Sequence, residues 1–366
     1  MSSYREEMAA KRALASRALP AGFPSLGAAG LAARLEPPPA GRVAMVLDTD
    51  TFNEIDDQFA IVQALLSPER LDLRAIYAAP FWNTRSESPG DGMEKSYDEI
   101  LELLQRMDVE PEGLVHRGST EILQDWDHPV PSPAASDLVA QAQAMPEGEL
   151  LYVVAIACIT NVASAILMEP SIIEKIVVVW LGGTANDWPT NLEYNLQGPC
   201  SCCSTLLRSA WPSALRRPVP AGDLKAAQLV MDCGVPLVRL PCAGVVTHLH
   251  SSIPEIDTYV KGKGAIGDFL AMRFREYAGG EANEMGWTKQ IWDMAAVAWV
   301  IDDSWIPTVL EATPLLTNDY TWSFDGGRHL NRTSTAAMNR DGIMRDFFVK
   351  LDAFAKQPGT APSSKL

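Results

Sequence analysis

Two hydrophobic periods alternate along this chain from about residue 42 onward. Short runs that are apolar at almost every position are typical of strands buried on both faces, and "RVAMVLDTD" (42–50), "ELLYVVAIA" (149–157) and "KIVVVWLGG" (175–183) are the clearest. Between such runs, apolar residues recur three or four positions apart, as in the amphipathic stretch "GMEKSYDEILELLQRM" (92–107). Strands of this kind separated by helices predict a parallel sheet with helices on both faces.

The remaining segments continue this alternation, and no internal repeat interrupts it. We expect one α/β domain over residues 41–355 with a mostly parallel central sheet, an N-terminal extension at 1–40 that is flexible or a targeting segment, and a C-terminal tail at 356–366. Further strands are predicted at 71–80 and 235–244, and further helices at 56–66, 160–168, around 253–277 and over 288–301.

Charge and composition narrow the classes of partner. The 366 residues contain 30 Lys and Arg against 46 Asp and Glu, a formal net charge of -16, which argues against nucleic acid or an anionic membrane as partner and favours a neutral or cationic ligand. The longest apolar runs are shorter than the roughly 18 residues of a membrane span. Six cysteines are too few for a disulfide framework in a chain of this length, so the cytoplasm is the default compartment.

Four aspartates crowd the segment "VLDTDTFNEIDDQFA", directly after the first predicted strand. They are Asp48, Asp50, Asp56 and Asp57. Ligands of parallel α/β sheets bind outside the carboxyl ends of the strands, so these side chains lie where a site is expected. Helix capping explains Asp56 or Asp57 but not the other two as well. A hard divalent cation such as Ca²⁺ or Mg²⁺ would offset the mutual repulsion of the four carboxylates.

A fifth aspartate, Asp293, interrupts the apolar run "IWDMAAVAWVI". An unpaired buried carboxylate costs several kcal/mol, so this side chain needs a partner, and a metal ion is the favoured one. The neighbouring Trp292 is either a packing residue or a platform for an aromatic ligand.

Five blocks along the chain resemble, in order, the conserved blocks of the nucleoside hydrolases. The first is similar to the family's DTDxxxDD signature but is two residues longer between Asp50 and Asp56. Ala157 and Cys158 replace Gly-Pro in the block that resembles GPLTN. The blocks are "DTDTFNEIDDQFAI", "AAPFWN", "AIACITNVASAIL", "LGGTANDWPTNLEYN" and "IWDMAAVAWVI". The resemblance covers most of residues 43–301 and implies a nucleoside hydrolase-like, Rossmann-like domain.

The resemblance also implies roles for individual residues. Asp50, Asp57, Asp293 and the backbone carbonyl of Thr160 would bind one Ca²⁺, and Asp50 would be the general base that deprotonates the attacking water. The side chains that would hold the ribose hydroxyls are Asp56, Asn83, Glu193 and Asn195, with Asn186 as an addition.

Trp292 stands where the non-specific branch of the family has a histidine that protonates the leaving base. In this respect the chain resembles the purine-preferring branch, which stacks the base between two tryptophans. Trp126 is our candidate for the second, with Trp82 and Trp188 as alternatives. The implied activity is hydrolysis of the N-glycosidic bond of ribonucleosides, with purine nucleosides preferred, by a homodimer or homotetramer.

Two other functions stay open on the sequence. "DTDT" is also similar to the start of haloacid-dehalogenase-type phosphatases, in which Asp48 would be the nucleophile and Asp302 and Asp303 would help to bind Mg²⁺. Alternatively, the protein binds nucleosides without turnover, because residues 199–222 have no counterpart in the family pattern and follow Asn195 closely. Removing them restores "EYNLQGDLKAAQLV", so we interpret them as an insertion, and Cys200, Cys202 and Cys203 within them as incidental.

Overall fold

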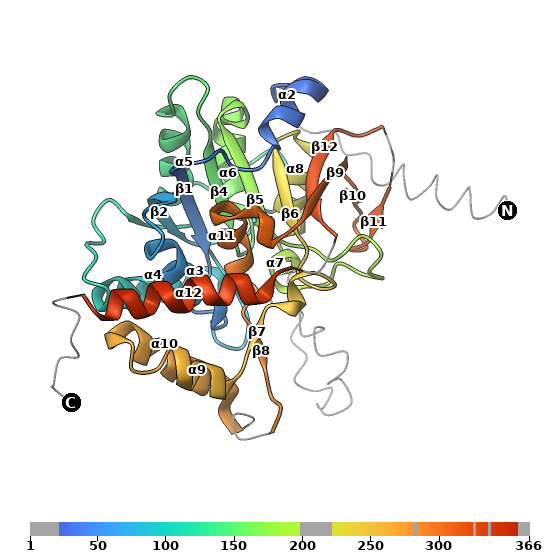
Figure 1. The fold of residues 1–366 in the computed structure, drawn as a ribbon. Coiled ribbons are helices and arrows are strands. Elements are labelled where there is room, and N and C mark those ends of the chain that lie inside the picture. Colours follow the sequence, from blue (N-terminus) through green and yellow to red (C-terminus); the bar gives the residue numbers. More distant parts are fainter. Residues whose placement is uncertain (1–21, 198–221, 281–284, 325–326, 336–337, 358–366) are drawn as a thin grey trace.

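An eight-stranded sheet forms the centre of the molecule, in agreement with the predicted α/β fold (Figure 1). The computed structural model describes residues 22–197, 222–280, 285–324, 327–335 and 338–357. The strand order is β3-β2-β1-β4-β5-β6-β12-β9, and every neighbouring pair is parallel except β12 and β9. The strands of this sheet are β1 (Val43–Thr49), β2 (Leu71–Ala78), β3 (Val115–Arg117), β4 (Leu151–Ala155), β5 (Ile176–Leu181), β6 (Leu237–Leu240), β9 (Thr308–Ala312) and β12 (Leu330–Ser334).

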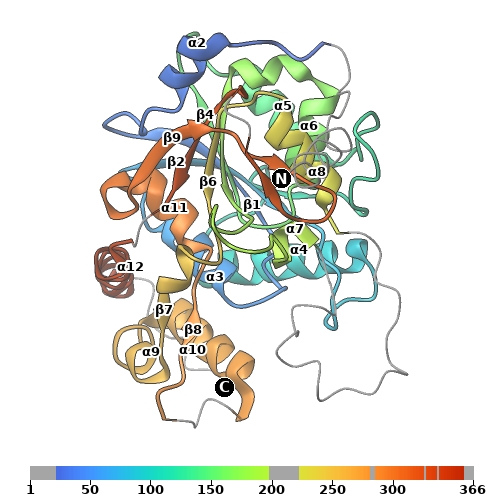
Figure 2. The ribbon, with the colours of Figure 1, turned by 90° about the vertical axis from the view of Figure 1, so that its right-hand side faces the viewer.

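Helices follow most of the strands and cover both faces of the sheet (Figures 1 and 2). One face carries α3 (Asp56–Leu65), α4 (Pro89–Arg106), α11 (Met294–Ile301) and α12 (Arg340–Ala355), and the other carries α5 (Pro133–Gln143), α6 (Thr160–Met168) and α8 (Leu224–Asp232). The shorter pieces are α2 (Gly27–Arg34), α7 (Tyr194–Gln197), β10 (Leu315–Leu316) and β11 (Trp322–Ser323), and a separate group comprises α9 (Ile253–Tyr259), α10 (Gly264–Ala278), β7 (His250–Ser251) and β8 (Lys289–Gln290).

The continuous apolar strands are explained by this double covering. Successive side chains of a strand point to opposite faces. In β1, Met45 and Leu47 pack into one core and Ala44 and Val46 into the other, and all four are buried. The two-sided burial confirms the interpretation of the apolar runs.

The order of the strands places a crevice between β1 and β4. The chain winds from β1 toward β3 on one side and from β4 toward β6 on the other, so the connections that leave β1 and β4 diverge. Ligands of doubly wound sheets bind at such a switch point, at the carboxyl ends of the strands. The aspartate-rich segment begins at the end of β1 and therefore faces this crevice.

The predicted helix over 288–301 is wrong in its first half. Lys289 and Gln290 form β8 and pair with β7, the amide of Ile291 donates to the carbonyl of Leu249 at 2.8 Å, and α11 begins only at Met294. These bonds to β7 hold the segment extended, which its apolar periodicity did not reveal. Asp293 is consequently the residue that precedes the first turn of α11, not one inside the helix.

Part of the predicted N-terminal extension packs onto the sheet. Residues 27–34 form α2, Leu31 and Leu35 are buried, and Arg332 of β12 donates a hydrogen bond to the carbonyl of Leu35. Residues 1–21, the proposed insertion at 199–222 except Gly222, and the tail from residue 358 lie outside the described residues.

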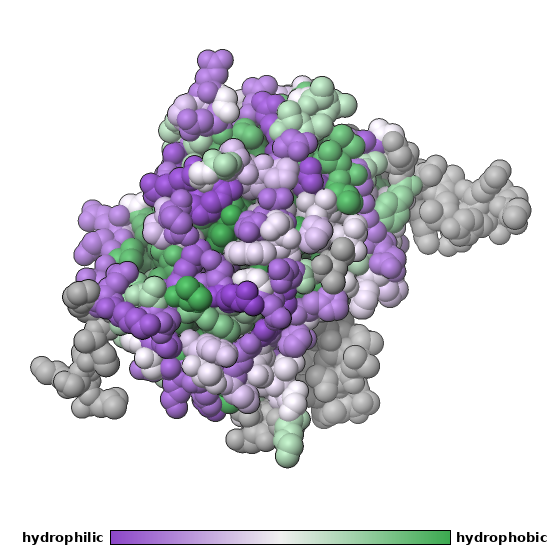
Figure 3. Space-filling model, in the orientation of Figure 1, coloured by the Kyte–Doolittle hydropathy of each residue, from purple (hydrophilic) through white to green (hydrophobic). Residues whose placement is uncertain are grey.

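Hydrophilic residues predominate on the face of the molecule seen in Figure 3, with hydrophobic ones in scattered patches. Among the helices of the described segments, none is long and apolar enough to cross a bilayer.

Candidate functional site

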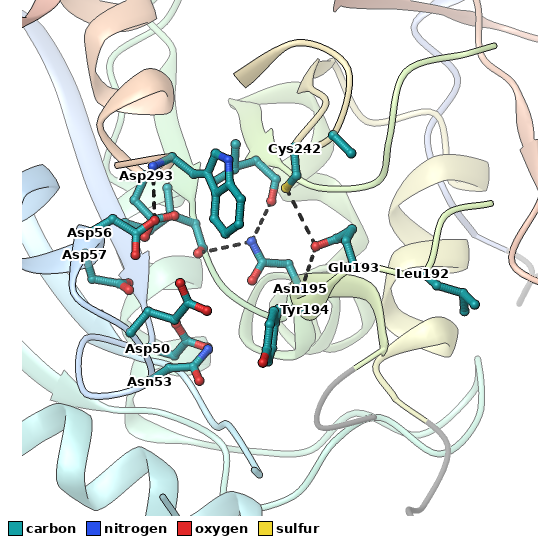
Figure 4. Close-up of a pocket in the computed structure, with 15 residues that line it drawn as sticks. Asp50, Asn53, Asp56, Asp57, Leu192, Glu193, Tyr194, Asn195, Cys242 and Asp293 are labelled. Carbon is teal, nitrogen blue, oxygen red and sulfur yellow. Dashed lines mark hydrogen bonds between the residues drawn. The ribbon is translucent and has the colours of Figure 1, made fainter. Parts of the chain in front are cut away.

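A cavity of about 280 Å³ opens at the carboxyl ends of the central strands (Figure 4). This volume is close to the lower end of the range for small-molecule sites. Asp50 enters its wall from β1, Ile156 from β4, Leu181 from β5 and Cys242 from the chain that follows β6. The full lining consists of Asp50, Asn53, Glu54, Asp56, Asp57, Ile156, Leu181, Leu192, Glu193, Tyr194, Asn195, Cys242, Ala243, Trp292 and Asp293.

Three buried aspartates meet on one side of the cavity. Asp56 and Asp57 open α3 and Asp293 precedes α11, so all three lie at helix N-termini, where the backbone favours negative charge. One carboxylate oxygen from each lies within 4.8 Å of the others. Figure 4 shows them grouped, with Asp50 below them and Glu193 and Cys242 across the cavity.

Burial and mutual repulsion raise the pKa values of carboxyl groups in this group. Burial and the Asp56 carboxylate together raise the pKa of Asp57 to about 7, against a 2.5 Å hydrogen bond from the Thr49 hydroxyl. Burial, together with Asp56, Asp57 and Asp50, raises the pKa of Asp293 well above its usual range. Carboxylates this close together are stable only when a proton or a bound cation reduces their mutual repulsion.

Asp50 extends the acidic wall and is held by its own loop. Its side-chain oxygen accepts a 3.0 Å hydrogen bond from the Asn53 amide, and its carbonyl accepts a 2.7 Å bond from the Asn53 backbone. Burial raises the pKa of Asp50, and Asp57, Asp56 and Glu54 add to the shift. A carboxyl with a raised pKa in a cavity is suited to accepting a proton.

Glu54 of the lining forms an ion pair with a buried lysine on this side of the cavity. The buried Lys289 ammonium lies 2.7 Å from Glu54 Oε2 and 3.8 Å from Asp56 Oδ1. Asp56 Oδ2 accepts a 3.0 Å hydrogen bond from the backbone amide of Trp292. The Lys289 ammonium also lies over the indole ring of Trp292, 4.6 Å from the ring centroid. Asp56 is thus fixed by the segment that carries Trp292 and Asp293.

Glu193 and Asn195 form the opposite wall. Glu193 accepts hydrogen bonds from the backbone amides of Gly183 at 2.9 Å and Asn195 at 2.8 Å, and burial raises its pKa to about 7. The Asn195 amide donates to the carbonyl of Leu181 at 2.8 Å and to that of Ile156 at 3.2 Å. These bonds tie both side chains to the ends of β5 and β4, so their positions relative to the acidic group are fixed.

The donor set fits a hard divalent cation. Asp56 Oδ1 is buried without a hydrogen-bond partner, and its neighbours Asp57 and Asp293 each present a carboxylate oxygen. Hard cations such as Ca²⁺ and Mg²⁺ prefer oxygen ligands of this kind. The three aspartates could therefore hold a metal ion.

Seven of the residues expected from the sequence line the cavity together: Asp50, Asp56, Asp57, Glu193, Asn195, Trp292 and Asp293. Asn83 stands one step behind it, because its amide donates to Asn53 Oδ1 at 2.5 Å and Asn53 in turn binds Asp50. Thr160 is also outside the lining: it begins α6, and its hydroxyl donates to Asp223 and accepts from the Leu123 amide at 3.0 Å.

The structure does not bring Asn186 or Trp126 to the cavity. The Asn186 amide donates to Glu311 at 2.7 Å and accepts from the buried Arg239, which places it in a separate polar cluster. Trp126 packs against the core under α5 and α6, with the Lys225 ammonium 3.9 Å from its ring centroid. Adjacent sequence positions did not reveal either partner, since each partner is remote in the chain.

The residues that a phosphatase would need are also apart. Asp48 does not line the cavity, and its side chain accepts a 2.8 Å hydrogen bond from Asn161. Asp302 and Asp303 follow the C-terminal end of α11, a helix about 12 Å long, whereas Asp293 precedes its N-terminal end. The phosphatase interpretation is therefore not favoured.

Several residues of the cavity were not expected from the sequence. Asn53 and Glu54 belong to the loop that is two residues longer than the common family form. This extra length was the one sequence feature that could have indicated their place in the cavity. Tyr194 lies between two expected residues in "EYN". Cys242 of the lining, and Lys289, which pairs with Glu54, gave no local signal, because their roles depend on contacts with distant segments.

The fold of this chain is that of the nucleoside hydrolases. A purine-preferring ribonucleoside hydrolase from Gardnerella vaginalis superimposes with a TM-score of 0.64 at 18% sequence identity, over 86% of this chain and 99% of that one. A plant nucleoside hydrolase gives 0.61 at 19% identity, over 86% and 100%. An inosine-uridine preferring nucleoside hydrolase from Bacillus anthracis gives 0.52 at 15% identity, over 86% and 99%. Neither a family model nor a curated protein matches the sequence.

Proposed function

We propose that this protein is a metal-dependent ribonucleoside hydrolase that prefers purine nucleosides. The observation that carries the proposal is the buried group of Asp56, Asp57 and Asp293, which shares one cavity with Asp50, Glu193 and Asn195 at the switch point of the sheet. The likeness in fold to proteins described as nucleoside hydrolases supports the same activity.

Ca²⁺ is the ion that we propose for the acidic group. Asp57 and Asp293 would hold it, beside Asp56, which the structure places within 4.8 Å of both. The family resemblance adds Asp50 and the backbone carbonyl of Thr160. When bound, it would lower the pKa of a coordinated water and neutralise part of the repulsion between the carboxylates.

The ribose is proposed to lie between the two walls of the cavity. Asp56 and Asn195, on opposite walls, would hold its hydroxyls with Glu193, and Asn83 would act through Asn53. Carboxylates accept from vicinal hydroxyls, and amides both donate and accept. The base would stack on Trp292, which lines the cavity.

The reaction needs one proton acceptor and stabilisation of positive charge. Asp50 would take a proton from water as the water oxygen bonds to C1′ of the ribose, the electron pair of the C1′–N bond would leave with the base, and the base would gain one proton from solvent. The transition state develops positive charge on the ribosyl ring, which the surrounding carboxylates stabilise more than they stabilise the neutral substrate.

Ribose release from inosine, adenosine and uridine, measured with Ca²⁺ and with chelator, tests the proposal. We expect release with Ca²⁺, its loss on chelation and a fall of at least about 100-fold in kcat for Asp50→Asn, a typical size for removal of a general base. Asp302→Asn is the matched control and should keep full activity. Phosphate release from a generic phosphate ester without base release would support the phosphatase instead, and binding of inosine without turnover would support an inactive homologue.

The proposal extends to the compartment and the assembly of the protein. We propose a cytoplasmic homodimer or homotetramer, and sedimentation of the purified protein would determine the assembly. Residues 199–222 stay a predicted insertion, and sequencing of the mature transcript would test it.

A further inference from the structure

The cavity carries more carboxyl groups than its expected cations can balance. Six carboxylate side chains line it, and a divalent ion and the Lys289 ammonium would supply three positive charges, half of the formal negative charge. Lys289 is already bound by Glu54 at 2.7 Å. The six are Asp50, Glu54, Asp56, Asp57, Glu193 and Asp293. Charges a few ångströms apart in a partly desolvated site interact by several kcal/mol, so a ligand that adds positive charge gains affinity here.

Aromatic rings at the same cavity also favour a cation. Trp292 and Tyr194 line it, and Tyr277 stands beside Glu54 and Lys289. The Lys289 ammonium lies 4.6 Å from the ring centroid of Trp292 and 5.1 Å from that of Tyr277. These rings therefore already accept one positive charge over their faces, the arrangement in which aromatic residues recognise organic cations.

No imidazole is available to protonate a leaving base. All five histidines fall within the described segments, and none lines the cavity. A neutral base departs as an anion unless it receives a proton, and an anion is disfavoured among carboxylates. A base that is already a cation departs as a neutral molecule and needs no proton.

We propose that the cavity selects ribosides whose leaving group carries a permanent positive charge, such as N-ribosylated pyridinium or N7-alkylated purine nucleosides. The inference rests on the proposed hydrolase function and specifies its substrate class. In the step, the C1′–N⁺ bond breaks, its electron pair neutralises the ring nitrogen, the water oxygen bonds to C1′ and the water proton passes to Asp50 and then to solvent.

Direct binding separates charge from reactivity. Isothermal titration calorimetry in Ca²⁺-containing buffer compares 1-methylnicotinamide, a cation, with nicotinamide, its neutral counterpart. We expect at least about tenfold tighter binding of the cation at low salt, a preference that shrinks as NaCl is raised. Glu54→Gln should reduce the preference at least threefold, whereas Glu110→Gln, which removes an exposed carboxylate outside the cavity, should leave it unchanged. Hydrolysis of 7-methylinosine, whose base carries a permanent positive charge, should exceed that of inosine in kcat/KM.

The outcomes separate the inference from the proposed function. Equal binding of the two pyridines by the wild-type protein at low salt overturns the inference, and hydrolysis of inosine in the same preparation would leave the proposed function intact. Failure to hydrolyse either riboside refutes the proposed function, and the calorimetric comparison still decides the charge preference. If Glu54→Gln does not fold, the salt dependence of the wild-type preference decides in its place.

Discussion

Replacement of Asp48 by asparagine tests whether a charge buried under the site limits stability. Asp48 is completely buried in β1, one of its oxygens accepts a hydrogen bond from Asn161 and the other has no partner. Burial, with a smaller contribution from the Asp223 carboxylate, raises its pKa from 3.8 to about 7. Asp48→Asn keeps the shape and the accepting oxygen but cannot ionise.

The pKa shift fixes the sign and size of the effect. Between about pH 4 and pH 7 the folded protein holds a proton on Asp48 that the unfolded chain has lost, so the free energy of unfolding falls as the pH rises. This contribution is present in full below the unfolded pKa and is lost as the pH rises through the folded one. A shift of this size corresponds to about 4 kcal/mol in total, of which about 2.5 kcal/mol is lost between pH 5 and pH 9.

Urea denaturation of the two proteins at pH 5 and pH 9 measures this difference. Asp48→Asn should gain about 2.5 kcal/mol relative to the wild type over that interval. Asp127→Asn, which removes an exposed carboxyl, is the control for the loss of one charge and should follow the wild type. If the curves of Asp48→Asn and the wild type stay parallel, Asp48 is not an ionising buried group and the reasoning fails.

Three further predictions concern the cavity and its support. Asp293→Asn should abolish both Ca²⁺ binding by calorimetry and ribose release, and Ca²⁺ binding that survives would exclude Asp293 as a ligand. Trp292→Leu should lower kcat/KM for inosine about tenfold, as loss of an aromatic contact does, whereas Trp126→Leu should change it less than about twofold; equal effects would contradict the placement of the base. Gly118→Ala should destabilise the fold by about 3 kcal/mol in urea, because its Cβ would lie 2.0 Å from the carbonyl oxygen of Ala78; an unchanged midpoint would contradict this.

Local pattern was sufficient for the strands and for most of the acidic wall. β1, β4 and β5 appear where continuous apolar runs predicted them, because a strand buried on both faces leaves no polar alternation. Asp50, Asp56 and Asp57 follow β1 directly in the sequence, so the end of one strand and the start of one helix place them together.

The segment around Asp293 shows where local pattern was insufficient. Its apolar residues have a helical period, but Lys289 and Gln290 form an antiparallel pair with His250 and Ser251 instead. The competing backbone partner is about 40 residues away, and no property of the segment itself indicates it. The start of α11, and with it the position of Asp293, therefore depended on tertiary pairing.

The sequence by itself determined that the protein is an α/β domain with a mostly parallel sheet and a cluster of carboxylates at the end of its first strand. Only the tertiary structure decided which polar residues share the cavity. Lys289 meets Glu54 from 235 positions away, whereas Asn186, close to Glu193 in sequence, turns toward Arg239 and Glu311. The physical reason is that hydrophobic period fixes the face on which a side chain lies, while the partner of a buried charge is set by which distant segments the fold brings within a few ångströms.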